Sequence, residues 1–282
     1  MKSQDKVAAD YVLGHSQPEL ERLVHQGRFF GELTEIMLLK AGLASGMRVL
    51  DVGCGAGDVS FLAAKLVGPE RVVVGVDKAP EAVAFAQQRA QGAGLSNVQF
   101  IAADLAEFQL DDEPVDALIG RFVLMYFPDP AAMLRRLLGF VKPGGIVAFQ
   151  ELDLAPAPPV EIMCQPICET YVAAATRITQ TFARAGIDGR TAVKLGPTFQ
   201  RAGLPAPQML ASQRVERGPD SPIYGWMEQI TRTLLPLIQQ TSVATAEEVQ
   251  VDTLAERMRQ EAVEKDCTLI TPPLIAAWAR KE

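Results

Sequence analysis

Hydrophobic positions form two alternating patterns between residues 48 and 153. Short runs rich in Val, Ile and Phe are apolar nearly throughout, as in strands buried on both faces of a parallel sheet. They occupy residues 48–52, 71–77, 98–103, 115–120 and 145–152. Amphipathic helices are predicted between them at residues 58–67, 80–93 and 130–141. This alternation predicts an α/β fold with a doubly wound sheet.

The pattern changes on both sides of this region. Residues 18–41 predict a helix that leads into the first strand, and residues 155–159 read Ala-Pro-Ala-Pro-Pro, a stiff connector. One or two helices are predicted at 160–185. Further helices are predicted at 190–202, 223–239 and 246–264, and strands at 208–217 and 267–277. Pro272 and Pro273 place the last strand at an edge or split it. We therefore expect an N-terminal helical lid (1–45), a core (46–153), and a helical cap with the last strands (154–282).

A glycine-rich turn follows the first predicted strand. Residues 49–61 read Val-Leu-Asp-Val-Gly-Cys-Gly-Ala-Gly-Asp-Val-Ser-Phe. Gly53, Gly55 and Gly57 allow positive φ and close approach of the backbone to a ligand. The helix that follows presents free N–H groups and the positive end of its dipole. The turn therefore predicts a site for a nucleotide-type cofactor.

The spacing of the glycines narrows the choice of cofactor. A dinucleotide fingerprint is G-x-G-x-x-G, but here the third glycine comes one residue early and is followed by Asp58. That carboxylate would face the pyrophosphate of NAD, so an NAD-dependent dehydrogenase is only a further alternative. A phosphate-binding P-loop needs Gly-Lys-Ser/Thr, which the chain lacks.

The pattern Asp51-x-Gly53-x-Gly55-x-Gly57 resembles motif I of the class I S-adenosylmethionine-dependent methyltransferases. S-adenosylmethionine has a sulfonium, an ammonium, one carboxylate and no phosphate, so an acidic rim is tolerable. The order of elements in residues 41–153 is also similar to that family, including the Lys-Pro-Gly-Gly turn at 142–145. The resemblance implies a mostly parallel, seven-stranded Rossmann-like sheet with a helical cap inserted in the C-terminal half.

The resemblance also implies roles for the loop and the second strand. Gly53, Gly55 and Gly57 would meet the methionine part of the cofactor, and Asp51 would support the loop and the amino group. Asp77, at the end of the second strand, would hold the ribose hydroxyls. The simpler alternatives are that Asp51 caps the loop and that Asp77 is a solvated strand end.

Later strand ends supply the remaining cofactor contacts implied by the family. Lys78 would pack beside the adenine, Asp104 would accept from its amino group, and the N–H of Leu105 would meet a ring nitrogen. The backbone around Gly120 and Arg121 would bind the ammonium. Alternatively, Asp104 is a helix N-cap, and the Arg121 side chain faces solvent or pairs with Asp129.

The N-terminal segment resembles a bacterial branch close to the ubiquinone/menaquinone-type C-methyltransferases. The resemblance rests on Tyr11-x-Leu13-Gly14 and Glu19-x-x-Arg22-Leu23-x-x-Gln26. It implies a segment covering the cofactor, with Tyr11 over the sulfonium and Gln26 or His25 at the methionine end. The alternative is that Tyr11 is an ordinary surface residue.

Methyl transfer is an in-line displacement for which the protein mainly positions and desolvates the nucleophile. The candidates for a general base are Glu151, Asp153, His15, His25 and Tyr126, and no two of them form a recognisable dyad. The fourth strand lacks an Asn/Asp-Pro-Pro-Tyr/Phe motif, which argues against transfer to an amino group of a nucleic-acid base or glutamine.

The helices after residue 153 predict a pocket for a small, fairly apolar acceptor. Its candidate lining is Met163, Tyr171, Ile178, Phe182, Tyr224, Trp226 and Met227, for which core packing is the alternative. Two other functions stay open. One is an S-adenosylmethionine-binding protein that catalyses a non-methylating reaction such as a cyclisation, and the other is a non-enzymatic binding or scaffold protein.

The composition of the chain argues against several classes of binding partner. The 282 residues include 34 acidic and 27 basic side chains, a net charge of −7, which argues against nucleic acid as a partner. Neither an apolar signal segment nor a run near the ~20 residues of a membrane span occurs, so we expect a cytoplasmic protein without a membrane partner. Cys164 and Cys168 lack further ligands, so no metal is expected. A homodimer stays open.

Overall fold

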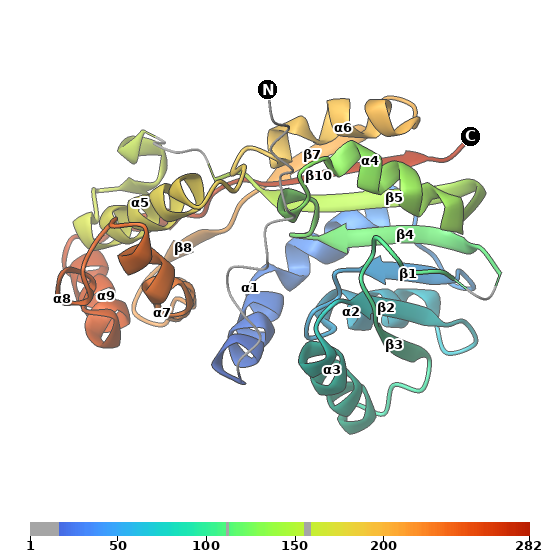
Figure 1. Ribbon diagram of the computed structural model, residues 1–282. Helices are drawn as coiled ribbons and strands as arrows, with labels where there is room; N and C mark the ends of the chain where they lie inside the picture. The colour runs from blue at the N-terminus through green and yellow to red at the C-terminus, as the bar shows by residue number, and fades with distance from the viewer. Residues whose placement is uncertain (1–16, 111–112, 155–158) are drawn as a thin grey trace.

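The computed structural model describes residues 17–110, 113–154 and 159–282. Its centre is a seven-stranded sheet in the order β3-β2-β1-β4-β5-β10-β7 (Figure 1). The first five strands are parallel, and β10 is antiparallel to both β5 and β7. The strands are β1 (Val49–Val52), β2 (Val73–Asp77), β3 (Val98–Ala102), β4 (Val115–Arg121), β5 (Val141–Leu152), β7 (Gln208–Ser212) and β10 (Leu274–Arg280). The predicted doubly wound, mostly parallel seven-stranded sheet is confirmed.

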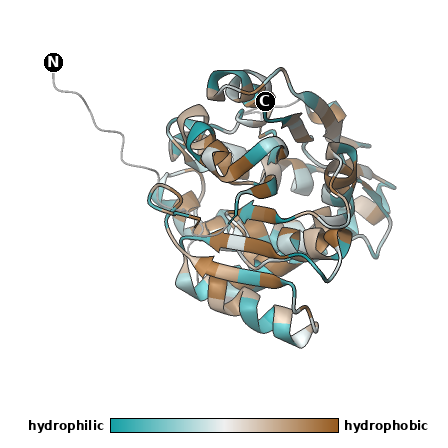
Figure 2. Cartoon of the chain, turned by 90° about the vertical axis from the view of Figure 1, so that its right-hand side faces the viewer, coloured by the Kyte–Doolittle hydropathy of each residue, from teal (hydrophilic) through white to brown (hydrophobic). Residues whose placement is uncertain are grey.

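Both faces of the sheet are covered, which explains why its strands are apolar throughout. On β4, Leu118 packs into the cluster that contains Leu134 and Phe199, whereas Ile119 packs into the cluster that contains Met37 on the opposite face. Successive residues of a strand point to opposite faces, so one strand supplies both cores. Figure 2 shows the strands mainly as hydrophobic and the outer helix surfaces as more hydrophilic.

Helices flank the sheet on both faces. One face is covered by α1 (Gln17–Ala41) and α2 (Asp58–Val67), and the other by α4 (Pro130–Leu137) and α6 (Leu195–Ala202). Helix α3 (Pro80–Gly92) packs on β3 near the sheet edge. Short 3-10 turns occur at Leu124–Tyr126, Leu138–Phe140, Val160–Ile162, Ala192–Lys194 and Val251–Thr253.

A second layer of helices forms the cap beside α1 (Figure 1). It contains α5 (Glu169–Arg184), α7 (Ile223–Gln240), α8 (Ala246–Val249) and α9 (Leu254–Glu264). A small antiparallel sheet joins them, in the order β6 (Cys164–Gln165), β9 (Thr268–Ile270), β8 (Val215–Arg217). The largest apolar cluster packs α5, α7 and α9 against Phe29 and Phe30 of α1.

The structure corrects several predicted elements of the C-terminal half. The helix expected at 160–185 begins only at Glu169, because the residue before Pro166 is disfavoured in a helix. The strand expected at 208–217 divides into β7 and β8, which belong to different sheets. The prolines at 272 and 273 do split the last predicted strand, into β9 and β10, but β10 lies inside the sheet. The helix expected at 246–264 is interrupted at Gln250, which has φ 49°.

Candidate functional site

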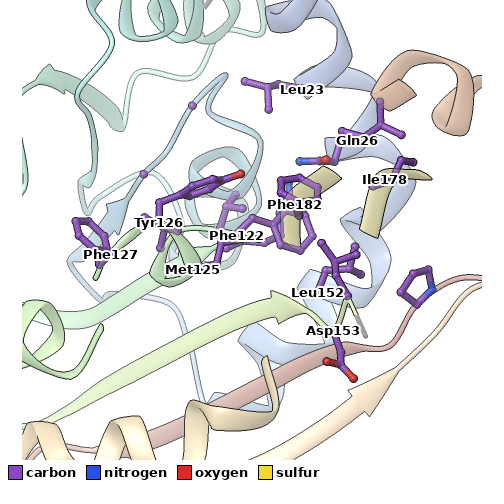
Figure 3. Close-up of a pocket in the computed structure, with 18 of the residues that line it drawn as sticks. Leu23, Gln26, Phe122, Met125, Tyr126, Phe127, Leu152, Asp153, Ile178 and Phe182 are labelled. Atoms are coloured by element: carbon purple, nitrogen blue, oxygen red, sulfur yellow. The ribbon is translucent and has the colours of Figure 1, made fainter. Parts of the chain in front are cut away.

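A cavity of about 920 Å³ lies at the carboxyl ends of the parallel strands and continues between the sheet and the cap. Pairing of Val52 with both Val76 and Gly120 brings the ends of β1, β2 and β4 to one edge. This edge is also where the chain order of the strands reverses, the usual ligand site of open α/β sheets. Figure 3 shows the cavity with side chains from α1, the β4 and β5 ends and α5 around it.

The glycine loop after β1 is held to β2 by hydrogen bonds. The N–H groups of Gly53 and Cys54 donate to the Val76 carbonyl at 2.8 and 3.1 Å. Asp77 Oδ2 accepts from the Gly55 N–H at 2.9 Å, and its Oδ1 accepts from the Ala79 N–H at 3.0 Å. Gly53, Gly55 and Asp77 line the cavity. Asp77 therefore fixes the loop and also reaches the ligand space.

Two of the predicted site glycines lie outside the cavity wall. A Cβ on Gly57 would lie 2.9 Å from the Phe100 ring, and one on Gly120 would lie 2.6 Å from the Phe149 ring. The absence of a side chain at these positions is needed for packing between elements. Both glycines therefore have a packing role, and contact of their backbone with a cofactor stays a prediction.

Asp51 lies beneath the loop and does not line the cavity. Its carboxylate is 1 % exposed and accepts a 2.6 Å hydrogen bond from the Ser60 hydroxyl. Burial raises the pKa of Asp51 to about 7, against the lowering effects of Ser60 and Arg121. Its position fits support of the loop, whereas direct contact with a ligand is absent from the geometry.

The ends of β2 and β3 supply another part of the wall. Lys78, Ala82, Asp104 and Leu105 all line the cavity. Asp104 Oδ1 accepts from the Ala106 N–H at 2.8 Å, so its side chain closes a turn, without the α-helix expected of an N-cap. Leu105 is buried and contributes an apolar surface beside the Asp104 carboxylate.

Arg121 is fixed by helix α1. Its Nη1 donates to the Thr34 hydroxyl at 2.9 Å, and that hydroxyl donates to Gln150 Oε1 at 2.8 Å. Asp129, the partner considered from the sequence, instead caps α4 by accepting from the N–H groups of Ala131 and Ala132. Burial lowers the pKa of Arg121, and the carboxylates of Asp58 and Asp51 oppose this effect.

The base candidates occupy different environments. His25 is exposed and outside the cavity wall, and both His15 and Tyr11 lie outside the described residues. Tyr126 lines the cavity, and burial raises the pKa of its hydroxyl. Asp153 also lines it, with Oδ1 3.1 Å from Arg190 Nε.

Glu151 is fully buried and lies outside the cavity wall. Its Oε1 accepts from the N–H groups of Val123 and Leu124 at 3.0 and 2.7 Å. Within the described part of the chain, no hydrogen-bond partner is found for Oε2. Burial raises the pKa of Glu151 to about 8. This carboxyl group therefore holds the turn after β4, and its role as a base stays a prediction.

The raised pKa of Glu151 predicts a pH-dependent stability. Because the native state binds this proton more tightly than the unfolded chain, its stabilising contribution is complete below about pH 4.5 and is lost as the pH rises through about 8. Glu151→Gln keeps an acceptor oxygen but cannot ionise. We expect urea unfolding from pH 5 to 9 to show wild type losing up to about 4 kcal/mol relative to this variant.

The exposed Glu107→Gln variant serves as the control for that comparison. Its stability should follow the wild-type curve across the range. If the free energies of unfolding of wild type and Glu151→Gln change with pH in parallel, Glu151 does not bind its proton more tightly in the folded state than in the unfolded chain.

The cap side of the cavity is mainly apolar. Six of the seven predicted acceptor-pocket residues line it, namely Met163, Tyr171, Ile178, Phe182, Trp226 and Met227. Tyr224 does not, because its hydroxyl donates to the Gly218 carbonyl at 2.9 Å outside the wall. The sequence pattern missed Ala175, Thr179 and Ile230, which share the helix faces of the predicted residues.

An aromatic cluster lies beside the cavity, and two of its rings, Phe122 and Trp226, line the wall. Phe29 stacks on Trp226 with ring centroids 4.9 Å apart, and Phe30 meets both Trp226 and Phe122 edge to face. Phe122 has φ 57°, a conformation that non-glycine residues rarely adopt and that is often found at functional sites. Sequence analysis did not identify Phe122, since no motif marks a positive φ at a phenylalanine.

The described residues contain no group of three His, Cys, Asp or Glu side chains that could hold a metal. The four cysteines are buried free thiols. A search of the described helices finds none with the length and apolarity that a membrane span requires.

The fold and the cavity together define the class I methyltransferase architecture, and comparison with known proteins supplies the family. A family model described as "Methyltransferase domain" matches residues 43–203, more than half of the chain. The chain belongs to this family, within the class I S-adenosylmethionine-dependent methyltransferase superfamily.

A curated relative and two solved structures illustrate the range of similar proteins. An arsenite methyltransferase of Halobacterium salinarum is 31 % identical over 158 residues, which cover 56 % of this chain and 40 % of that protein. A Haemonchus contortus phosphoethanolamine N-methyltransferase 2, in complex with phosphomonomethylethanolamine and S-adenosylhomocysteine, superposes with a TM-score of 0.59. It is 16 % identical, with 98 % of this chain and 60 % of that chain covered.

The second solved structure is the [4+2]-cyclase SpnF. It superposes with a TM-score of 0.50 at 21 % identity, over 89 % of this chain and 80 % of that chain. Identities this low establish a shared fold. The chain also spans only about 40 % of the length of the curated relative.

Proposed function

We propose that this chain is an S-adenosylmethionine-dependent methyltransferase with a small, largely apolar organic acceptor. The observation that carries the proposal is the continuity of one cavity from the glycine loop and Asp77 to the apolar surfaces of α5 and α7. Cofactor and acceptor can therefore meet inside one cavity. In this proposal, residues 1–45 cover the cofactor, 46–153 bind it, and 154–282 select the acceptor.

The residues at the sheet end of the cavity fit S-adenosylmethionine. Asp77 has lone pairs beyond those used by Gly55 and Ala79, which can accept from ribose hydroxyls. Asp104 can accept from the adenine amino group, with Leu105 packed beside the ring. The carboxylates of Asp58 and Asp77 both lie in the wall, and Asp58 is paired with Arg89 at 2.9 Å.

The bound cofactor would supply a methyl group attached to a sulfonium. The sulfur is a good leaving group because it departs as a neutral thioether. This chain then contributes orientation and desolvation, each worth several kcal/mol of barrier in favourable cases. Phe122, Trp226 and Met227 exclude water from the acceptor space. Tyr126 keeps its proton at neutral pH, because burial raises its pKa, and can serve as a hydrogen-bond donor. Asp153, in the cap-side wall, is the candidate to take a proton from an acceptor.

The charges on the cap side support an uncharged acceptor. Among the described wall residues there, the charged side chains are Asp153 and Arg190, and they face each other at 3.1 Å. An opposed pair leaves no net charge to bind a phosphate or another anion. Phosphomonomethylethanolamine, bound in one of the solved structures, carries a phosphate, and arsenite offers no apolar surface. Neither compound matches the chemistry that this compartment favours.

The proposal is tested with S-adenosylmethionine and a panel of acceptors. We expect S-adenosylhomocysteine and a product one methyl group heavier with phenols or polycyclic hydroxyketones, and little product with phosphoethanolamine or arsenite. Binding of S-adenosylmethionine without any methylated product would favour a non-methylating reaction such as a cyclisation. Failure to bind either form of the cofactor would favour a binding or scaffold protein.

A further inference from the structure

Helix α1 carries a buried ion pair, and one of its members, Arg22, lines the cavity. Glu19 is 1 % and Arg22 2 % exposed, and Arg22 Nε and Nη2 donate to the two Glu19 oxygens at 2.7 Å each. Removing two charges from water costs several kcal/mol, which the ion pair itself often fails to recover. A buried pair at a ligand cavity therefore calls for a role besides stability.

The pair controls the orientation of Gln26. Arg22 Nη1 lies 2.7 Å from Gln26 Oε1, one helical turn further along α1. A guanidinium can only donate hydrogen bonds, so the amide must present its oxygen to Arg22. The Gln26 NH₂ group is thereby directed away from Arg22. Gln26 lines the cavity, and Figure 3 shows its amide pointing toward the Tyr126 hydroxyl.

Packing places this amide above the glycine loop. Leu23 Cδ1 would be 3.4 Å from a Cβ on Gly55, and a Cβ on Gly27 would overlap the Asp58 side chain at 2.2 Å. The turn of α1 from Leu23 to Gly27 therefore lies against the loop and the start of α2. Gln26 offers N–H donors at the end of the cavity where the methionine part of the cofactor would lie.

We propose that Glu19 and Arg22 are positioning residues that fix the Gln26 amide as a hydrogen-bond donor to the carboxylate of S-adenosylmethionine. This inference rests on the proposed function. Because Glu19 neutralises Arg22, this pair adds no net charge beside the neutral amide donors of Gln26. The chain then distinguishes cofactors that carry this carboxylate from those that lack it.

Calorimetric titration with S-adenosylmethionine and decarboxylated S-adenosylmethionine tests the inference by binding alone. We expect wild type to prefer S-adenosylmethionine at least tenfold. Gln26→Glu replaces the donor with a carboxylate, so the preference should disappear or reverse. The double variant Glu19→Leu/Arg22→Leu removes both charges of the pair together, and it should reduce the preference several-fold with decarboxylated-cofactor affinity little changed.

Glu32→Gln, at an exposed position further along α1 and outside the cavity wall, is the control and should keep the wild-type preference. Equal loss of both affinities in the double variant would show a merely structural role and overturn the inference. An unchanged preference in Gln26→Glu would do the same. Failure of wild type to bind either compound would instead overturn the proposed function on which the inference rests.

Discussion

Replacing Asp77 with Ala should weaken S-adenosylhomocysteine binding at least tenfold, a loss of about 1.4 kcal/mol or more. The variant removes the acceptor for the ribose hydroxyls and also the two hydrogen bonds that hold Gly55 and Ala79. Both losses act on the same ligand-facing loop. Asp77→Asn retains one acceptor oxygen and the shape of the side chain, so its loss should be smaller. Isothermal titration calorimetry measures all three proteins.

Glu81→Ala is the control for Asp77. Glu81 is an exposed carboxylate in the first turn of α3, four residues further along the chain. Its replacement should leave the affinity within about twofold of wild type. An Asp77→Ala protein that remains folded by circular dichroism and binds S-adenosylhomocysteine with unchanged affinity would remove Asp77 from the cofactor site.

Replacing Ala175 with Phe should block the acceptor compartment while leaving cofactor binding intact. Ala175 lies on α5 in the cap-side wall, so the larger ring enters the cavity. Displacing a substrate from its reacting position by about 1 Å can cost on the order of 100-fold in rate. We expect kcat/KM for the best acceptor of the panel to fall by about this factor. The affinity for S-adenosylhomocysteine should change less than about threefold.

Ala173→Phe provides the matched comparison, because Ala173 lies on the same helix but outside the cavity wall. It adds the same ring without entering the acceptor space, so kcat/KM should stay near wild type. Equal losses in the two variants would indicate general disturbance of α5. Full activity in Ala175→Phe would place the acceptor elsewhere in the protein.

The elements that could be predicted from the sequence are those whose boundaries are marked by nearby residues. Helix α2 begins and ends where its pattern predicted, since Gly57 and Gly68 bound a strongly amphipathic run. The cap was harder, because its short strands pair across long sequence separations. Cys164 pairs with Leu269, and nothing near either residue indicates this partner. Similarly, Pro272 and Pro273 precede β10 and do not interrupt it, so they do not exclude this strand from the inside of the sheet. The sequence did not show where the strand begins.

The candidate site shows the same division. Asp77, Asp104 and the loop glycines could be proposed because the carboxyl ends of parallel strands meet at one edge. The burial of individual side chains could not be predicted from the sequence. Glu151 and Asp51 stand next to apolar residues in the sequence, but only the structure shows that both lie outside the cavity wall. The Glu19, Arg22 and Gln26 spacing of three and four residues did carry a signal for a shared helix face.

In the proposed function, one cavity holds the cofactor at the glycine loop and the acceptor beneath the cap. A crystal structure of the chain with S-adenosylhomocysteine tests it most directly. We predict density for the ribose at Asp77, for the adenine beside Leu105, and for the amino-acid end below Gln26, with the space facing Trp226 left for the acceptor. Density for the ligand at any other surface, or spread across the cap-side compartment, would contradict the account.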